Sequence, residues 1–186
     1  MMRFLITALL ALVCFPAAGQ LHPCDDPSLP KELAWNPPKA DTTERLAQFY
    51  RMNDTLSKAV GSKDFELAAS TARKFLEESR YYRCNWNFGN AIHDAHAALG
   101  MEALHRGDVS AAASFLVQAG RSPGSPQLDT FGPDLDLAKA VLNAGRKDAV
   151  AAYLWGIGRF WKEDDGLVER WKLDLSAGRT PDFDSD

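Results

Sequence analysis

The stretch that decides the fold is residues 99–119, LGMEALHRGDVSAAASFLVQA, in which two helical patterns meet at Gly107. On both sides of this glycine, small and apolar residues recur every three or four positions, the spacing of one helix face. A glycine just past a helix end is a common stop signal, and Asp108 is a favourable N-cap for the helix that follows. The stretch therefore predicts two helices joined by a short turn.

The arrangement recurs along the chain. An offset of 38 residues brings Gly107 onto Gly145, and then Leu116 onto Leu154. Recurrence at such a period indicates a helical repeat in which each pair buries its apolar side against the next. The patterns predict helices over residues 42–60, 65–76, 90–106, 109–119, 133–142, 150–161 and 167–175, and no strand.

Between the fourth and fifth predicted helices, residues 121–132 (RSPGSPQLDTFG) interrupt the helical patterns. Pro123 and Pro126 make the segment rigid, and Leu128 and Phe131 are candidate apolar anchors. We expect an ordered loop that covers one edge of the helices or shapes the lip of a groove.

The unit around Gly107 resembles a tetratricopeptide repeat, with His96 in place of the usual tryptophan and Ala103 in place of the usual tyrosine. The positions that carry the resemblance are Leu99, Gly100, Gly107, Asp108, Ala112, Leu116, Ala119 and, one residue from its expected place, Pro123. The strings GNAIH, PGSPQL and FGP are also similar to a group of uncharacterised bacterial proteins with helical-repeat character. These resemblances imply an all-α, short right-handed solenoid of about three antiparallel helix pairs with a C-terminal capping helix.

The N-terminus predicts export. Arg3 precedes an apolar run, and the small residues Ala17 and Gly19 suit signal-peptide cleavage, with an uncleaved anchor as the alternative. We expect a signal peptide at 1–19, an extended proline-rich arm at 20–41, the repeat domain at 42–175 and an acidic tail at 176–186. The mature protein would be secreted or periplasmic, without a membrane segment.

Cysteine usage bears on the same expectation. Cleavage would remove Cys14 and leave Cys24 and Cys84, which could form a disulfide in an oxidising compartment or remain two free thiols. A bond between them would hold the arm against the helices.

The formal charge of −4 argues against nucleic acid as a partner. We expect a module that binds a protein or peptide in the concave groove of the array, without a cofactor. The candidate groove residues are Tyr50, Asn53, Asn90, His93, Ala97 and Gln127.

The alternative is a hydrolytic or metal-dependent enzyme that uses His93. His93 and His96 lie one helical turn apart, but zinc needs three or four ligands and no third is indicated. As a base, His93 would act with Asn90, Asp134 or Asp136, yet no nucleophile motif accompanies it. We therefore predict no catalytic set; His96 should fill an aromatic position in the core and His93 should bond a backbone carbonyl.

A purely structural envelope protein is a third possibility. Trp155 stands out because its helix places Leu154 and Ile157 inward and leaves Trp155 on a different face.

Overall fold

The computed structural model describes residues 43–184, and this part of the chain is all-α, with eight helices and no strand. The predicted signal peptide, the arm and Cys24 lie outside the described residues. The helices are α1 (Thr43–Gly61), α2 (Phe65–Ser79), α3 (Phe88–His105), α4 (Val109–Ala119), α5 (Pro126–Phe131), α6 (Asp136–Asn143), α7 (Lys147–Ile157) and α8 (Leu167–Ser176).

Side-chain caps begin several of these helices. The Asp64 carboxylate accepts a hydrogen bond from the Leu67 amide at the start of α2, and the Asp108 carboxylate accepts one from the Ala111 amide at the start of α4. Capping of this kind satisfies a backbone donor that the helix leaves unpaired. Gly107 has a φ of 79°, in the left-handed region that a glycine adopts without strain, so it lets the chain turn from α3 into α4.

Two predicted boundaries around the proline-rich connection are wrong. The connection contains helix α5, because Ser125 caps it through the Leu128 amide and Pro126 fits its first turn. Pro133 precedes α6 instead of opening it, since the Asp134 carboxylate accepts a hydrogen bond from the Asp136 amide before the helix begins. Leu128 is buried as expected, but Phe131 is 79% exposed and does not anchor the segment.

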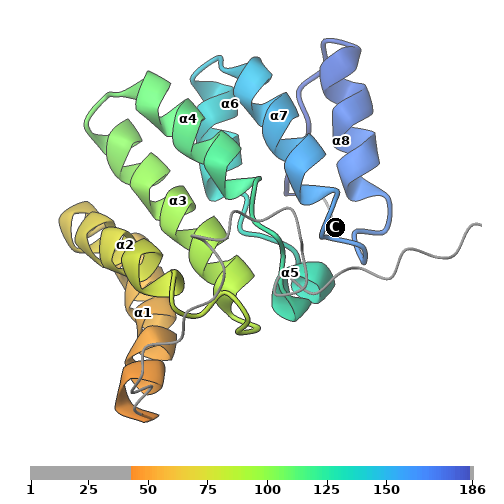
Figure 1. The fold of residues 1–186 in the computed structure, drawn as a ribbon. Coiled ribbons are helices and arrows are strands. Elements are labelled where there is room, and N and C mark those ends of the chain that lie inside the picture. The colour runs from red at the N-terminus through yellow and green to blue at the C-terminus, as the bar shows by residue number, and fades with distance from the viewer. Residues whose placement is uncertain (1–42, 185–186) are drawn as a thin grey trace, which may run out of the picture.

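Neighbouring helices in chain order pack against each other from α1 to α4 and from α6 to α8, whereas α5 lies apart and contacts only α3 among the described helices, as Figure 1 shows. In addition, α3 contacts both α1 and α6, and α4 contacts α7. The crossing of α4 and α7 is close: a Cβ added to Gly156 would lie 2.1 Å from the carbonyl oxygen of Gly120. The absence of both side chains is what permits this approach.

Two apolar clusters form the core. One joins α1, α2 and the near side of α3, and the other runs from α3 to α8. Leu99 belongs to the first cluster and Leu154 to the second, and both are buried, as the repeat pattern predicts. Trp155 is 68% exposed, which agrees with its expected position on another face.

The segment after α8 packs against that helix. The indole N–H of Trp171 donates to the carbonyl oxygen of Asp182 at 2.8 Å, and the Phe183 ring meets the Trp171 ring edge-on at 4.9 Å. The predicted acidic tail therefore begins inside α8 and returns along it as far as residue 184.

Cys84, in the turn between α2 and α3, is disulfide-bonded. Its predicted partner, Cys24, lies outside the described residues, so the pairing itself stays a prediction. None of the helices between residues 43 and 184 is both long and apolar enough to cross a membrane.

Candidate functional site

A groove of about 580 Å³ lies between α1, α3, α5 and α6, and we call it the central groove. Its floor is apolar, with the buried residues Leu56, Leu128 and Leu137. Polar side chains and partly exposed apolar ones stand around that floor. The polar ones include Asn53, Ser57, Lys63, Asn90, Asp94, Gln127, Asp134 and Asp136, and the apolar ones include Ala97, Met101 and Phe131.

The wall formed by α5 is fixed to the first turn of α3. The Ser122 hydroxyl donates to the Gly89 carbonyl oxygen at 2.7 Å and accepts from the Gly124 amide at 3.1 Å. The two backbones touch here, because a Cβ added to Gly89 would lie only 1.8 Å from the Gly124 carbonyl oxygen. The GNAIH and PGSPQL strings thus meet in space, although more than 30 residues separate Gly89 from Ser122.

Asn90 completes this attachment. Its amide nitrogen donates to Asn87 Oδ1 at 2.9 Å and to Gln127 Oε1 at 2.8 Å, and its Oδ1 accepts from the Ser125 hydroxyl. Asn90 is 2% exposed. Its hydrogen-bonding groups are therefore used to hold α5 in place, and it shapes the groove without offering a free amide to a ligand.

His93 lies beneath the groove, in a buried chain of hydrogen bonds. Its Nδ1 lies 2.8 Å from Asp94 Oδ1, and its Nε2 lies 3.0 Å from the hydroxyl of Tyr153 on α7. The Tyr153 hydroxyl is also 3.4 Å from the carbonyl oxygen of Asp134. Both rings are 1% exposed, so the chain ties α3, α7 and the segment before α6 together.

The donors in this chain follow from its partners. A carboxylate only accepts hydrogen bonds, so the His93 Nδ1 carries the proton and donates to Asp94. In a neutral imidazole the other nitrogen, Nε2, then accepts a hydrogen bond from the Tyr153 hydroxyl. Burial raises the pKa of Tyr153 well above its ordinary value, and the negative charges of Asp134 and Asp94 raise it further. Tyr153 therefore stays protonated and acts as a hydrogen-bond donor.

The predicted partner of His93 is wrong. His93 forms hydrogen bonds with two side chains and none with a backbone carbonyl of the described residues. The histidine that bonds the backbone is His96, whose Nδ1 donates to the Ile92 carbonyl oxygen at 2.7 Å. Because Asp94 and Tyr153 occupy both nitrogens of a buried ring, no His93 nitrogen is presented to the groove.

The structure brings four of the six predicted groove residues to the groove, namely Asn53, Asn90, Ala97 and Gln127. Tyr50 is elsewhere: its hydroxyl accepts from the Asn85 amide at 2.8 Å and its ring stacks on Trp86 at 5.6 Å. The side chain of Asn53 has a buried Oδ1 with no hydrogen-bond partner in the described part of the chain.

Asp94, Met101 and Phe131 are groove residues that the sequence reasoning missed. On α3, the lining residues Asn90, Asp94, Ala97 and Met101 follow one stripe at helical spacing. The predicted groove residues of this helix, Asn90, His93 and Ala97, define a face about one position away. Helical spacing identifies such stripes but does not say which of them lacks a neighbouring helix.

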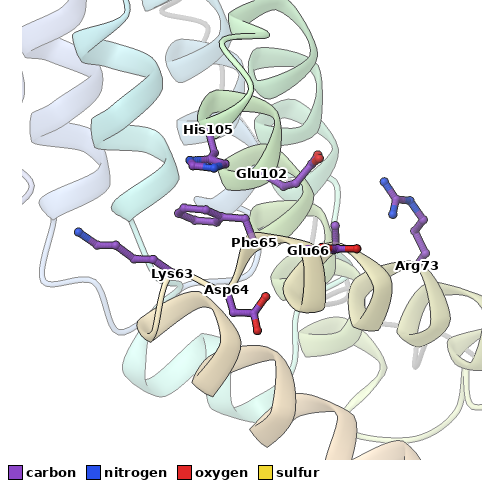
Figure 2. Close-up of a pocket in the computed structure, with 8 residues that line it drawn as sticks. Lys63, Asp64, Phe65, Glu66, Arg73, Glu102 and His105 are labelled. Carbon is purple, nitrogen blue, oxygen red and sulfur yellow. The ribbon is translucent and has the colours of Figure 1, made fainter.

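A smaller cavity of about 350 Å³ lies at the turn between α1 and α2 and the end of α3. Figure 2 shows the Phe65 ring beside His105, with Lys63 and Arg73 extending in different directions. The centroids of the Phe65 and His105 rings are 4.6 Å apart. The charged groups of this cavity do not converge on one point, so the cavity has no defined position for a ligand.

Within residues 43–184, no group of three or more histidine, cysteine, aspartate or glutamate side chains is arranged to hold a metal ion. Comparison of the chain with protein-family models, with curated proteins and with solved structures finds no match.

Proposed function

We propose that this chain is an exported, tetratricopeptide-like interaction module that binds an extended peptide segment of a protein partner. The observation that carries the proposal is the central groove, with an apolar floor and polar walls in a volume of about 580 Å³. Grooves of this size and make-up are typical of ligand sites, whose few polar groups fix the orientation of what they bind.

The helix contacts support a short solenoid. α1 with α2, α3 with α4, and α6 with α7 each form a contacting pair, and α8 packs on α7 as a capping helix would. The first helices of successive pairs also contact each other, α1 with α3 and α3 with α6, and they line the central groove. In a repeat array, such a row of first helices forms the concave binding surface.

The polar groups of the groove suit a peptide backbone. An amide side chain has both a donor and an acceptor, as a peptide bond does. Gln127 is exposed at the groove, and its Oε1 is already fixed by Asn90. Asn53 also lines the groove, and its side chain supplies a second amide there.

Two features support export. The apolar N-terminus has the order of a signal peptide, and Cys84 is disulfide-bonded, as is common outside the cytosol. We expect N-terminal sequencing of the protein recovered from the periplasm or the medium to start at Gln20. A chain that keeps Met1 and stays in the cytosol would contradict this part of the proposal.

The groove itself is tested by filling it. Ala97→Trp places a large ring in the groove, and Ala151→Trp makes the same change on α7, outside it. Short fluorescent peptides are selected from a random library on the full chain, and their affinities are measured by anisotropy. We expect Ala97→Trp to weaken binding about tenfold or more, or about 1.4 kcal/mol, and Ala151→Trp to leave it unchanged.

Circular dichroism establishes that both variants keep their helices. The proposal fails if the library yields no bound peptide, or if folded Ala97→Trp binds the selected peptides as tightly as the unchanged chain.

A further inference from the structure

The central groove is lined by more negatively charged side chains than positively charged ones. Asp94, Asp134 and Asp136 lie on the side formed by α3 and α6, and Lys63 is the basic residue among the groove's described lining residues. A low-dielectric wall that carries negative charge attracts cations and repels anions. The groove therefore distinguishes ligands by the sign of their charge.

Two of these carboxylates have no lysine or arginine partner within residues 43–184. Asp94 Oδ1 is paired only with His93, and the Asp134 carboxylate accepts from the Asp136 amide at 2.7 Å. The nearby Lys139 ammonium pairs with Asp184 and lies 3.8 Å from Asp136, and its charge reaches Asp134 only at longer range. Neither Asp94 nor Asp134 therefore forms a salt bridge with a lysine or arginine of the described residues, and both carboxylates can pair with a ligand cation.

The buried chain below the groove fixes where the Asp94 charge stands. The Asp94 side chain is 32% exposed, and its Oδ1 is held at 2.8 Å by a His93 ring that Tyr153 orients in turn. This leaves Asp94 Oδ2 without a hydrogen-bond partner among the described residues. A preorganised carboxylate loses less conformational entropy when it binds a cation than a freely rotating one.

We infer that the central groove selects a peptide segment that carries a lysine or arginine side chain between apolar side chains, and that Asp94 and Asp134 receive its cation. Met101 and Phe131 offer the apolar surface for the flanking side chains. The inference rests on the proposed function and adds the chemical class of the ligand. His93 and Tyr153 are positioning residues in this arrangement, since they act through Asp94.

The experiment selects short peptides from a random library on the full chain and sequences the bound fraction. We expect lysine or arginine to be enriched next to leucine, isoleucine, phenylalanine or methionine. One selected lysine peptide, and the same peptide with glutamine in place of the lysine, are then titrated against each variant. Asp94→Asn and Asp134→Asn each remove a charge without changing shape, and Glu169→Gln removes one on α8, outside the groove.

A charge-assisted contact that is partly shielded from water is worth roughly tenfold in affinity. We expect each aspartate variant to bind the lysine peptide about tenfold more weakly, while the glutamine peptide binds all the chains alike. Glu169→Gln should match the unchanged chain. Asp134 is exposed, so Asp134→Asn gives a readout even if Asp94→Asn disturbs folding.

The outcomes separate the inference from the proposed function. If no peptide is enriched, the proposed function fails and the inference fails with it. If apolar peptides are enriched without a basic residue, or with an acidic one, the groove binds peptides but the inference is overturned. Equal affinity of the lysine peptide for the unchanged chain and both aspartate variants would overturn it as well.

Discussion

Replacing Gly89 by alanine tests whether the α5 segment is truly pressed against α3. The added Cβ would lie 1.8 Å from the Gly124 carbonyl oxygen, whereas an ordinary contact begins at 3.4 Å. The two backbones would therefore have to separate by about 1.6 Å, the difference between these distances. Neither side of the contact is a flexible side chain, so the clash cannot be relieved by a change of rotamer and requires a shift of the main chain.

The cost follows from the two ways in which the molecule can respond. If the segment stays, overpacking costs about 1–3 kcal/mol. If it moves, it loses the hydrogen bonds from Ser122 to Gly89, from Ser125 to Asn90 and from Asn90 to Gln127, worth about 0.5–1.5 kcal/mol each. Gly89 is the second residue of α3, so alanine recovers about half of the roughly 1 kcal/mol by which it exceeds glycine in a helix interior. Subtracting this from the cost of overpacking leaves a net loss of about 0.5–2.5 kcal/mol.

The assay is urea unfolding of the full chain, followed by circular dichroism and by tryptophan fluorescence. Gly61→Ala is the matched control, because Gly61 also lies in a helix and a Cβ there meets nothing within 4 Å. It should leave the free energy of unfolding unchanged or raise it by up to about 1 kcal/mol. Unfolding of Gly89→Ala at the same urea concentration as the unchanged chain, or a higher one, would refute the close contact.

Two further predictions concern stability. Leu128→Ala should lower the free energy of unfolding by about 2–4 kcal/mol, because Leu128 is buried. Phe131→Ala should change it by less than about 0.5 kcal/mol, because Phe131 is exposed. Equal effects of the two variants in urea unfolding would contradict the position of α5. Burial lowers the pKa of His96 below its ordinary 6.5, so around and below that pH the unfolded chain binds more protons and stability falls as the pH falls. The urea midpoint of unfolding of His96→Phe should therefore depend less on pH than that of the unchanged chain, and an equal dependence would contradict the prediction.

The helices were predictable because their evidence is local. The turn glycine Gly107, the cap Asp108 and the apolar spacing around Leu154 all act within one or two turns, and the structure confirms them. The six residues of α5 were missed because Ser125 and Pro126 signal a helix start only if a helix is expected there. Flanking prolines and glycines favoured an irregular loop instead.

The site was less predictable because it depends on contacts between distant segments. A helical wheel gives the direction of a side chain but not the neighbour it meets. His93 points at Tyr153, 60 residues away, so a residue expected in the groove lies under it. Asp94 was not among the predicted groove residues, yet it lies beside a groove that only the folding of α5 and α6 creates.

The contact between Gly89 and Gly124 also limits how this molecule can be recombined with others. A Cβ added to Gly89 would meet the main chain of Gly124, which has no side chain to trim, so a larger residue at position 89 cannot be compensated at position 124. A chimera that imports the turn leading into α3 must also import residues 121–128, as a single cassette. Exchanging either segment alone would place an α3 turn and a 121–128 segment in contact whose main chains do not fit each other.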